Sequence, residues 1–161
     1  MLLETLAAAI QASPLSGTLR SSLWLYPLVN TGHVVGIALL FGAIVPLDLR
    51  LLGWWRRMPV DDLAGILVPV SVVGLLLALS TGSMLFATRP LDYVGEPLFG
   101  IKMGLLLLAV GNALLLRRSL PRASGQSGAG DRPRLAWRLA GIVSVALWLG
   151  VITAGRLIGY R

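Results

Sequence analysis

Residues 30–53 read NTGHVVGIALLFGAIVPLDLRLLG. This stretch is almost continuously apolar, and it carries His33, the only histidine of the chain. About 20 helical residues cross the ~30 Å hydrocarbon layer of a bilayer, so a run of this length predicts a transmembrane helix. The sequence therefore poses the question of why one imidazole lies inside a membrane segment.

The composition of the whole chain agrees with a membrane protein. Of 161 residues, 56% are hydrophobic and only 13% are charged, whereas soluble domains carry roughly 25% charged residues. The chain has no cysteine, which excludes disulfides, thiolate metal sites and cysteine nucleophiles. The net charge of +7 comes from arginines between apolar runs, which favours membrane topology and anionic lipid over a nucleic-acid partner.

Four apolar segments are long enough to span, at residues 23–52, 63–88, 98–116 and 135–158. Backbone groups in lipid must be satisfied internally, and the runs do not alternate as barrel strands do, so these segments are predicted to be helices. Residues 1–14 show apolar positions at helical spacing and predict an interfacial amphipathic helix that Pro14 ends. Residues 119–134, rich in Gly, Ser, Pro and Arg, predict a flexible cytoplasmic loop. The expected fold is all-α: one integral membrane domain, residues 1–161, built as a four-helix bundle with a short N-terminal interfacial helix.

Positive charge predicts the orientation of the bundle. Nine of the fourteen basic residues lie in or beside the loops after the first and third segments. Since cytoplasmic loops carry an excess of Lys and Arg, both loops are predicted to be cytoplasmic and both termini outside. Trp24 at one end of the first segment, and Trp54 and Trp55 at the other, fit the interfacial aromatic belts. The expected location is the bacterial inner membrane, with the chain crossing several times.

Small residues recur every four positions in all four segments. Such spacing lets helix backbones approach closely where lipid gives no hydrophobic drive for association, so it predicts a compact bundle. The positions are Gly32 and Gly36; Gly74, Ala78 and Gly82; Gly100 and Gly104; and Gly155 and Gly159.

His33 is the first candidate site residue. It lies about 10 Å below Tyr26 at 1.5 Å per residue, and Asn30 and Tyr26 share its helical face. Ionisable groups facing lipid are costly, so this face is expected to point into the bundle. Two interpretations stand side by side: a neutral histidine hydrogen-bonded between helices, or a ligand of haem or of a metal.

Lys102 lies four residues into the third segment, at the depth of His33. Either it snorkels to the headgroups, or it points inward and binds an anionic group such as a carboxylate. We expect His33 and Lys102 to line one pocket between the first three membrane helices. Met84 and Met103 share this depth, and a thioether either packs or completes a haem or copper site with imidazole.

Other polar residues are expected to have structural roles outside this pocket. Asp48 with Arg50, and Asn112 with Arg117, close the first and third segments and predict structural pairing near the headgroups. The chain has no HExxH motif, no P-loop and no acidic pair at mid-membrane depth. No catalytic residue is predicted.

The run VVGIALLFGAIVPLDLRLL after His33, together with LFGIKMGLLLLAVGNALLL at 98–116, resembles a superfamily of membrane proteins. It comprises CopD-like copper-resistance proteins and HemJ-type protoporphyrinogen oxidases, and the chain is most similar to an uncharacterised branch of short bacterial members. By this resemblance His33, Arg50 and Lys102 take the positions of the family's histidine, arginine and lysine. The resemblance implies binding of haem b or another porphyrin by His33 and Lys102. The chain departs from the HemJ-type pattern with IALLF in place of aromatic residues, and it has no second histidine.

Three functions remain open on the sequence. The first is a tetrapyrrole-binding or redox-associated membrane protein, with His33 as axial ligand and Tyr26, Asn30, Arg50 and Lys102 as further binding residues. The second is copper binding or transport through His33, Met84 and Met103. The third is a non-catalytic subunit of a larger membrane complex, in which His33 only joins two helices.

Overall fold

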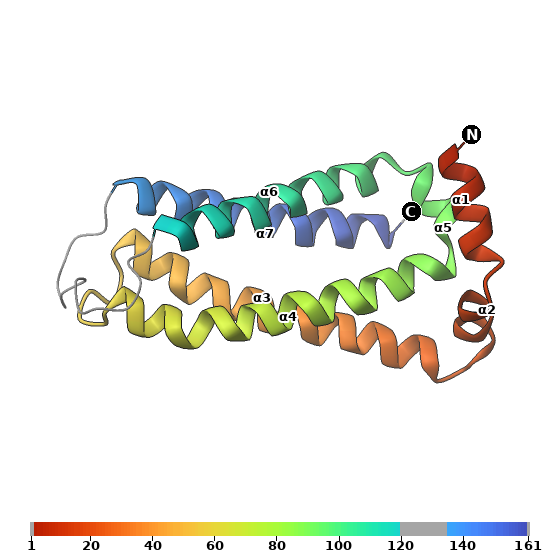
Figure 1. Cartoon of the computed structure of the whole chain (residues 1–161), viewed down its shortest axis with the longest axis horizontal. Helices are drawn as coiled ribbons and strands as arrows, with labels where there is room; N and C mark the ends of the chain where they lie inside the picture. The colour runs from red at the N-terminus through yellow and green to blue at the C-terminus, as the bar shows by residue number, and fades with distance from the viewer. Residues whose placement is uncertain (1, 120–134, 161) are drawn as a thin grey trace.

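The computed structural model describes residues 2–119 and 135–160, and within these ranges all regular structure is helical (Figure 1). The helices are α1 (Leu2–Gln11), α2 (Pro14–Ser21), α3 (Leu25–Leu52), α4 (Val60–Thr88), α5 (Pro90–Val94), α6 (Pro97–Ser119) and α7 (Leu135–Ile158). Four of them, α3, α4, α6 and α7, are long and apolar enough to cross a membrane. The chain is a multi-pass, all-α membrane protein, as the composition predicts.

The four long helices form two antiparallel pairs. α3 packs along α4, α6 packs along α7, and the two pairs meet mainly where α3 contacts α7. α4 and α6 face each other on one side of the bundle without packing as a pair (Figure 1). This arrangement leaves room between the pairs, and the candidate site lies there.

The predicted spans agree with the observed helices, with small differences at their ends. α4 begins at Val60, ahead of the predicted 63–88, and α6 continues through Ser119, a position predicted to lie in the loop. The rest of that predicted loop, 120–134, lies outside the described residues. α3 is 28 residues long, or about 42 Å at 1.5 Å per residue, so it exceeds the hydrocarbon thickness and must tilt or protrude.

The N-terminal region differs from the prediction of one interfacial helix. Pro14 starts a second helix, α2, because proline fits the first helical position and Ser13 caps it. The Ser13 hydroxyl accepts a hydrogen bond from the backbone N–H of Ser16 at 3.3 Å. α1 packs on the unpredicted α5, and α2 packs on the end of α4, so these short helices cover the end of the bundle where both termini lie (Figure 1).

Glycines bring α3 and α4 into close contact. A methyl group added at Gly74 would lie 2.5 Å from the backbone nitrogen of Leu40, and one added at Gly36 would lie 2.6 Å from that of Ala78. The small-residue pattern thus marks a real interface on these two helices. On α6 it does not, because a methyl group at Gly100 or Gly104 would meet nothing within 4 Å.

The α3–α4 connection is held by Gly53 and Arg50. Gly53 has φ +104°, the left-handed conformation that glycine adopts without strain, and it ends α3. The Arg50 side chain is 1% exposed, and its Nε donates to the carbonyl of Met58 at 2.6 Å. Arg50 therefore pairs with loop backbone, and the predicted pairing with Asp48 near the headgroups is not formed.

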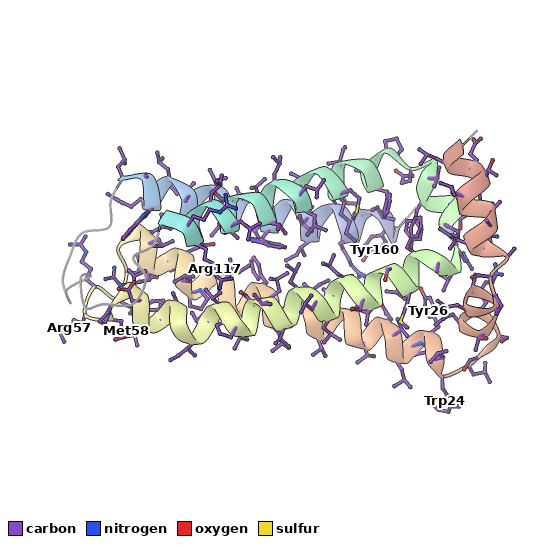
Figure 2. The ribbon with its side chains drawn as sticks, in the orientation of Figure 1. Trp24, Tyr26, Arg57, Met58, Arg117 and Tyr160 are labelled. Carbon is purple, nitrogen blue, oxygen red and sulfur yellow. The ribbon has the colours of Figure 1, made fainter. Side chains whose placement is uncertain are left out.

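Aromatic side chains are exposed at both ends of α3. Trp24 is exposed at the end that α1 and α2 cover (Figure 2), and Trp54 and Trp55, which follow the other end of α3 in the chain, are exposed as well. Tryptophan prefers the membrane–water interface, so the two levels mark the two faces of the bilayer. The Arg-rich end, which holds Arg56, Arg57, Arg117 and Arg118, lies opposite the end with the termini (Figures 1 and 2). Which end faces the cytoplasm stays a prediction.

Candidate functional site

A cavity of about 620 Å³ lies between the two helix pairs, in the half of the bundle nearer the termini. α3, α4, α6 and α7 all contribute to its walls, which are mostly apolar. The side chains with ionisable groups on its lining are His33, Lys102 and Arg156. The volume falls within the ~300–1,000 Å³ usual for small-molecule sites, which combine apolar walls with a few polar groups.

His33 is fixed by hydrogen bonds across the α3–α4 interface. Its Nδ1 lies 2.9 Å from the carbonyl oxygen of Ala78 and 3.3 Å from Oγ1 of Thr81. A carbonyl oxygen can only accept, so Nδ1 carries the proton. The Thr81 hydroxyl donates to the Leu77 carbonyl at 2.6 Å, which leaves its oxygen free to accept from Nδ1 as well.

This arrangement sets the tautomer of His33 and leaves its second nitrogen available. In the neutral ring Nε2 is an unprotonated acceptor, and it makes no hydrogen bond within the described part of the chain. Metal-ligating histidines typically donate their other ring N–H to a carbonyl or a carboxylate, which orients the ring. Gly82 gives the ring its space, because a methyl group there would lie 2.9 Å from Cε1 of His33.

Lys102 enters the same cavity from α6. Its stem lies against α7 at Gly155, where an added methyl group would lie 3.3 Å from both Cε and Nζ. Over residues 2–119 and 135–160, the ammonium group makes no hydrogen bond and no ion pair. Lys102 is only partly exposed. An unpaired cation on an apolar wall is suited to hold an anionic group of a ligand.

An aromatic cluster closes the end of the cavity toward the termini. Phe86 of α4 stacks on Phe99 of α6 with ring centroids 5.3 Å apart, and both rings line the cavity. Tyr93 of α5 packs against both, at 5.7 and 5.4 Å. Burial, with smaller contributions from Tyr26 and Asp92, raises the pKa of the Tyr93 phenol, so it is neutral at physiological pH. The cluster joins α4 to α6 at this end of the cavity.

The structure brings some of the predicted residues together and separates others. His33, Lys102 and Met103 line the cavity. Met84 does not line it and is 37% exposed. The three side chains proposed to bind copper, His33, Met84 and Met103, therefore do not converge on this cavity.

Tyr26 and Asn30, predicted to share a binding site with His33, do not join it in this cavity. Both are exposed, and neither lines the cavity. They lie in the first two turns of α3, whereas the α3 lining of the cavity begins at His33. Helical spacing gives the direction of a side chain but not where along the helix a cavity begins.

Arg50 is also remote from His33. Seventeen residues of α3 separate them, or about 25 Å along the helix. Arg50 holds the α3–α4 connection, as described above, and it does not line the cavity.

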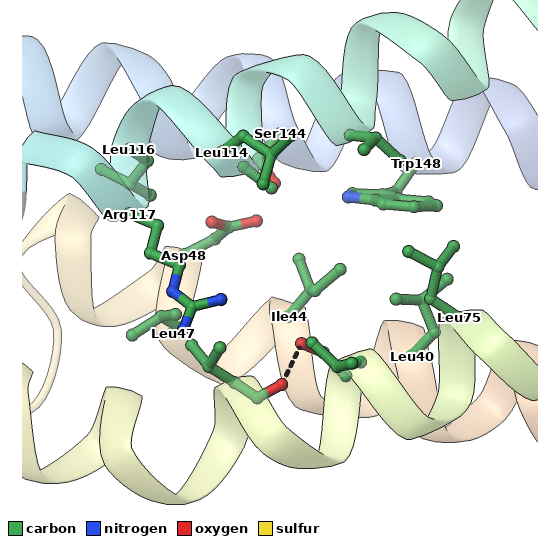
Figure 3. Close-up of a pocket in the computed structure, with 15 residues that line it drawn as sticks. Leu40, Ile44, Leu47, Asp48, Leu75, Leu114, Leu116, Arg117, Ser144 and Trp148 are labelled. Atoms are coloured by element: carbon green, nitrogen blue, oxygen red, sulfur yellow. Dashed lines mark hydrogen bonds between the residues drawn. The ribbon is translucent and has the colours of Figure 1, made fainter.

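A second, smaller cavity of about 140 Å³ lies toward the Arg-rich end of the bundle (Figure 3). Asp48, Ser144, Trp148 and Arg117 line it. Sequence reasoning assigned only structural pairing to Asp48 and Arg117, and it missed Ser144 and Trp148. The signal for a second site was the acidic residue itself, since a carboxyl within a membrane segment is costly.

No protein-family model, curated protein or solved structure matches this chain. Membership of the superfamily that the sequence resembles is therefore a proposal.

Proposed function

We propose that the chain binds haem or a related tetrapyrrole in the His33–Lys102 cavity, as a member of the superfamily that its sequence resembles. The cavity would lie in the outward half of the bacterial inner membrane, with both termini outside. Haem combines a large apolar ring, an iron that imidazole ligates, and carboxylate groups. The cavity offers apolar walls for the ring, His33 for the iron and Lys102 for a carboxylate.

The observation that carries this proposal is the state of His33. Its protonated Nδ1 is engaged by Ala78 and Thr81, so Nε2 remains as a free lone pair beside an apolar space. Neutral imidazole is the form that binds haem iron. A histidine that served only to join α3 and α4 needs Nδ1 alone and does not need a cavity of about 620 Å³ beside it.

Lys102 supports the same ligand class. Its ammonium has no anionic partner within the described chain, and it lies on the wall of the same cavity. A carboxylate of a bound porphyrin would supply that partner through a charge-assisted hydrogen bond. When bound, haem would supply redox chemistry, while the residues of this chain bind and orient it and the apolar walls exclude water.

Copper is the less favoured ligand, because Met84 lies away from the cavity and thioether ligands are what a Cu(I) site would need. The subunit alternative assigns no ligand to the cavity. It would instead use the outer face of α6, where Gly100 and Gly104 have open space.

A titration of the purified, detergent-solubilised protein with haemin tests the proposal. The wild type should develop a Soret band that saturates at one haemin per chain. His33→Ala should remove the iron ligand and lower the affinity strongly. Thr31→Ala is a matched control on the same helix, because Thr31 is exposed and its hydroxyl bonds only to the Pro27 carbonyl.

The result against the proposal is equally clear. If haemin binds the wild type, His33→Ala and Thr31→Ala alike, the binding is non-specific and the role of His33 is the α3–α4 contact alone. If copper without haemin saturates the wild type, the copper alternative replaces the present one.

A further inference from the structure

Within the described part of the chain, two buried polar atoms beside the smaller cavity have no hydrogen-bond partner. The Asp48 side chain is 2% exposed, and its Oδ2 accepts no hydrogen bond. Trp148 is 3% exposed, and its Nε1–H donates to nothing. Both residues line this cavity, and the indole nitrogen lies on the side of the ring toward Asp48 (Figure 3).

The two atoms are complementary. One is an acceptor and the other a donor, so a small molecule with both capacities satisfies the pair. The Ser144 side chain lies beside the Asp48 carboxyl (Figure 3), and Ser144 and Trp148 are four residues apart on α7, or about 6 Å along the helix. A hydrogen-bonded bridge of one or two water molecules covers this separation.

The size and surroundings of the cavity fit water. A volume of about 140 Å³ exceeds the ~30 Å³ that one water occupies in the liquid, and the site has the polar partners that a buried water needs. A metal cation is disfavoured, because the indole N–H points inward and Arg117 lines the same cavity. An apolar occupant would leave both polar atoms unsatisfied.

We propose that this cavity is a hydrated proton-exchange site with Asp48 as the proton-binding group. In the exchange, Asp48–COOH and a water give Asp48–COO⁻ and H₃O⁺: the acid O–H bond breaks, its electron pair stays on the carboxyl oxygen, and the proton forms a new O–H bond on water. Arg117, an exposed residue on the cavity wall, marks the side from which water enters.

The charged and titratable groups around Asp48 are few. Arg117 faces it from α6, while α7 contributes Ser144 and Trp148. α4 contributes Ser71, whose hydroxyl donates to the Val68 carbonyl at 2.8 Å. Arg50, two residues along α3, is engaged with the Met58 and Arg56 carbonyls. Of the described residues that line the cavity, Asp48 and Arg117 are the ionisable ones.

The site lies next to the ligand cavity but does not depend on it. Leu40, Leu75 and Trp148 line both cavities, so Trp148 forms part of a shared wall. The proposal needs no ligand in the larger cavity. Its test uses protein to which no haem or metal is added, so its failure and the failure of the haem proposal are separate results.

Infrared spectroscopy of the full chain in lipid nanodiscs tests the proposal. The difference between wild type and Asp48→Asn identifies the bands of the Asp48 carboxyl. Across a pH series these bands should interconvert reversibly between the carbonyl stretch of the acid and the carboxylate stretches. Transfer to D₂O should shift the acid band quickly, because water reaches the site.

Two further variants and one control keep the test decisive even if Asp48→Asn does not fold. Ser71→Leu fills the cavity without removing a hydrogen bond between helices, and it should slow or abolish the D₂O shift. Ser80→Leu is its matched control on the same helix, because Ser80 is exposed and its hydroxyl bonds only to the Leu76 carbonyl. Trp148→Phe removes the indole donor and should displace the Asp48 bands.

The contradicting results are specific. A carboxyl that stays in one form at every pH at which the bundle is folded is no proton-exchange site. An Asp48 acid band that does not shift during hours in D₂O indicates that no water reaches the cavity. Equal behaviour of Ser71→Leu and Ser80→Leu places the exchange outside this cavity. Each of these results overturns the proposal.

Discussion

His33 of α3 donates its Nδ1–H to the backbone carbonyl of Ala78 of α4 at 2.9 Å, and this bond fixes the ring across the helix interface. The acceptor is backbone, so it is present whatever side chain stands at position 78. The bond determines which nitrogen is protonated and leaves Nε2, on a side chain that lines the cavity, without a hydrogen bond in the described part of the chain. The ligand proposal follows from this relationship.

The space that Gly82 leaves for this ring should matter for affinity. Gly82→Ala would place a methyl group 2.9 Å from Cε1 of His33, so the ring must shift. We expect haemin affinity to fall about tenfold, the lower end of the effect of disturbing a ligand's orientation. Gly100→Ala, where a methyl group meets nothing within 4 Å, should bind haemin as the wild type does. Equal affinities of both variants would mean that the ring is free to relocate.

The contact between α3 and α4 should be sensitive to added volume. Gly74→Leu and Ala78→Leu insert side chains where the backbones of α3 and α4 touch. Overpacking of this kind costs ~1–3 kcal/mol, so both variants should unfold at lower denaturant concentration in detergent. Gly104→Leu on α6 faces open space and should unfold as the wild type does. If Gly74→Leu and Gly104→Leu unfold alike, helix packing in the membrane differs from this structure.

Comparing haemin with its dimethyl ester separates the role of Lys102 from that of His33, the proposed iron ligand. Lys102→Met removes the ammonium and keeps an apolar stem. It should weaken haemin binding by about tenfold, or ~1.4 kcal/mol. The same substitution should have little effect on haemin dimethyl ester, which has no carboxylate. An equal loss for haemin and its ester would show that Lys102 shapes the cavity without binding the acidic group.

Membrane orientation is open to a direct chemical test because the chain has no cysteine. Single cysteines at Asp92 and Arg57 occupy exposed positions at opposite ends of the bundle. A membrane-impermeant thiol reagent on intact cells should label Asp92→Cys and spare Arg57→Cys. The positive-inside distribution of arginine is the reason. The reverse labelling would invert the bundle and place the His33 cavity in the inner half.

The spans of α3, α4, α6 and α7 were predictable because a membrane-spanning segment must be a long, continuous apolar helix, and such runs are visible in the sequence. The depth of His33 and Lys102 followed from residue counting along two helices, and both line one cavity. The short helices α2 and α5 were not predicted, because they lack a long apolar run and are defined by local capping and packing.

The sequence did not specify how the helices surround the site. Periodicity placed Tyr26 and Asn30 on the face of His33, but both side chains are exposed and neither lines the cavity. The sequence did not predict that Trp148 and Ser144 line a cavity with Asp48. Their place there depends on the packing of α7 against α3, which no spacing in the sequence specifies.

The central claim is that this protein carries a tetrapyrrole ligated by His33. The most direct measurement is the visible spectrum and the metal content of the chain purified from cells supplied with both a haem precursor and copper. We predict a Soret band with iron bound to the wild type, and loss of both in His33→Ala while the helical circular dichroism is retained. A wild-type protein that is purified folded, with neither haem nor copper, contradicts the claim and leaves His33 as a hydrogen bond between α3 and α4.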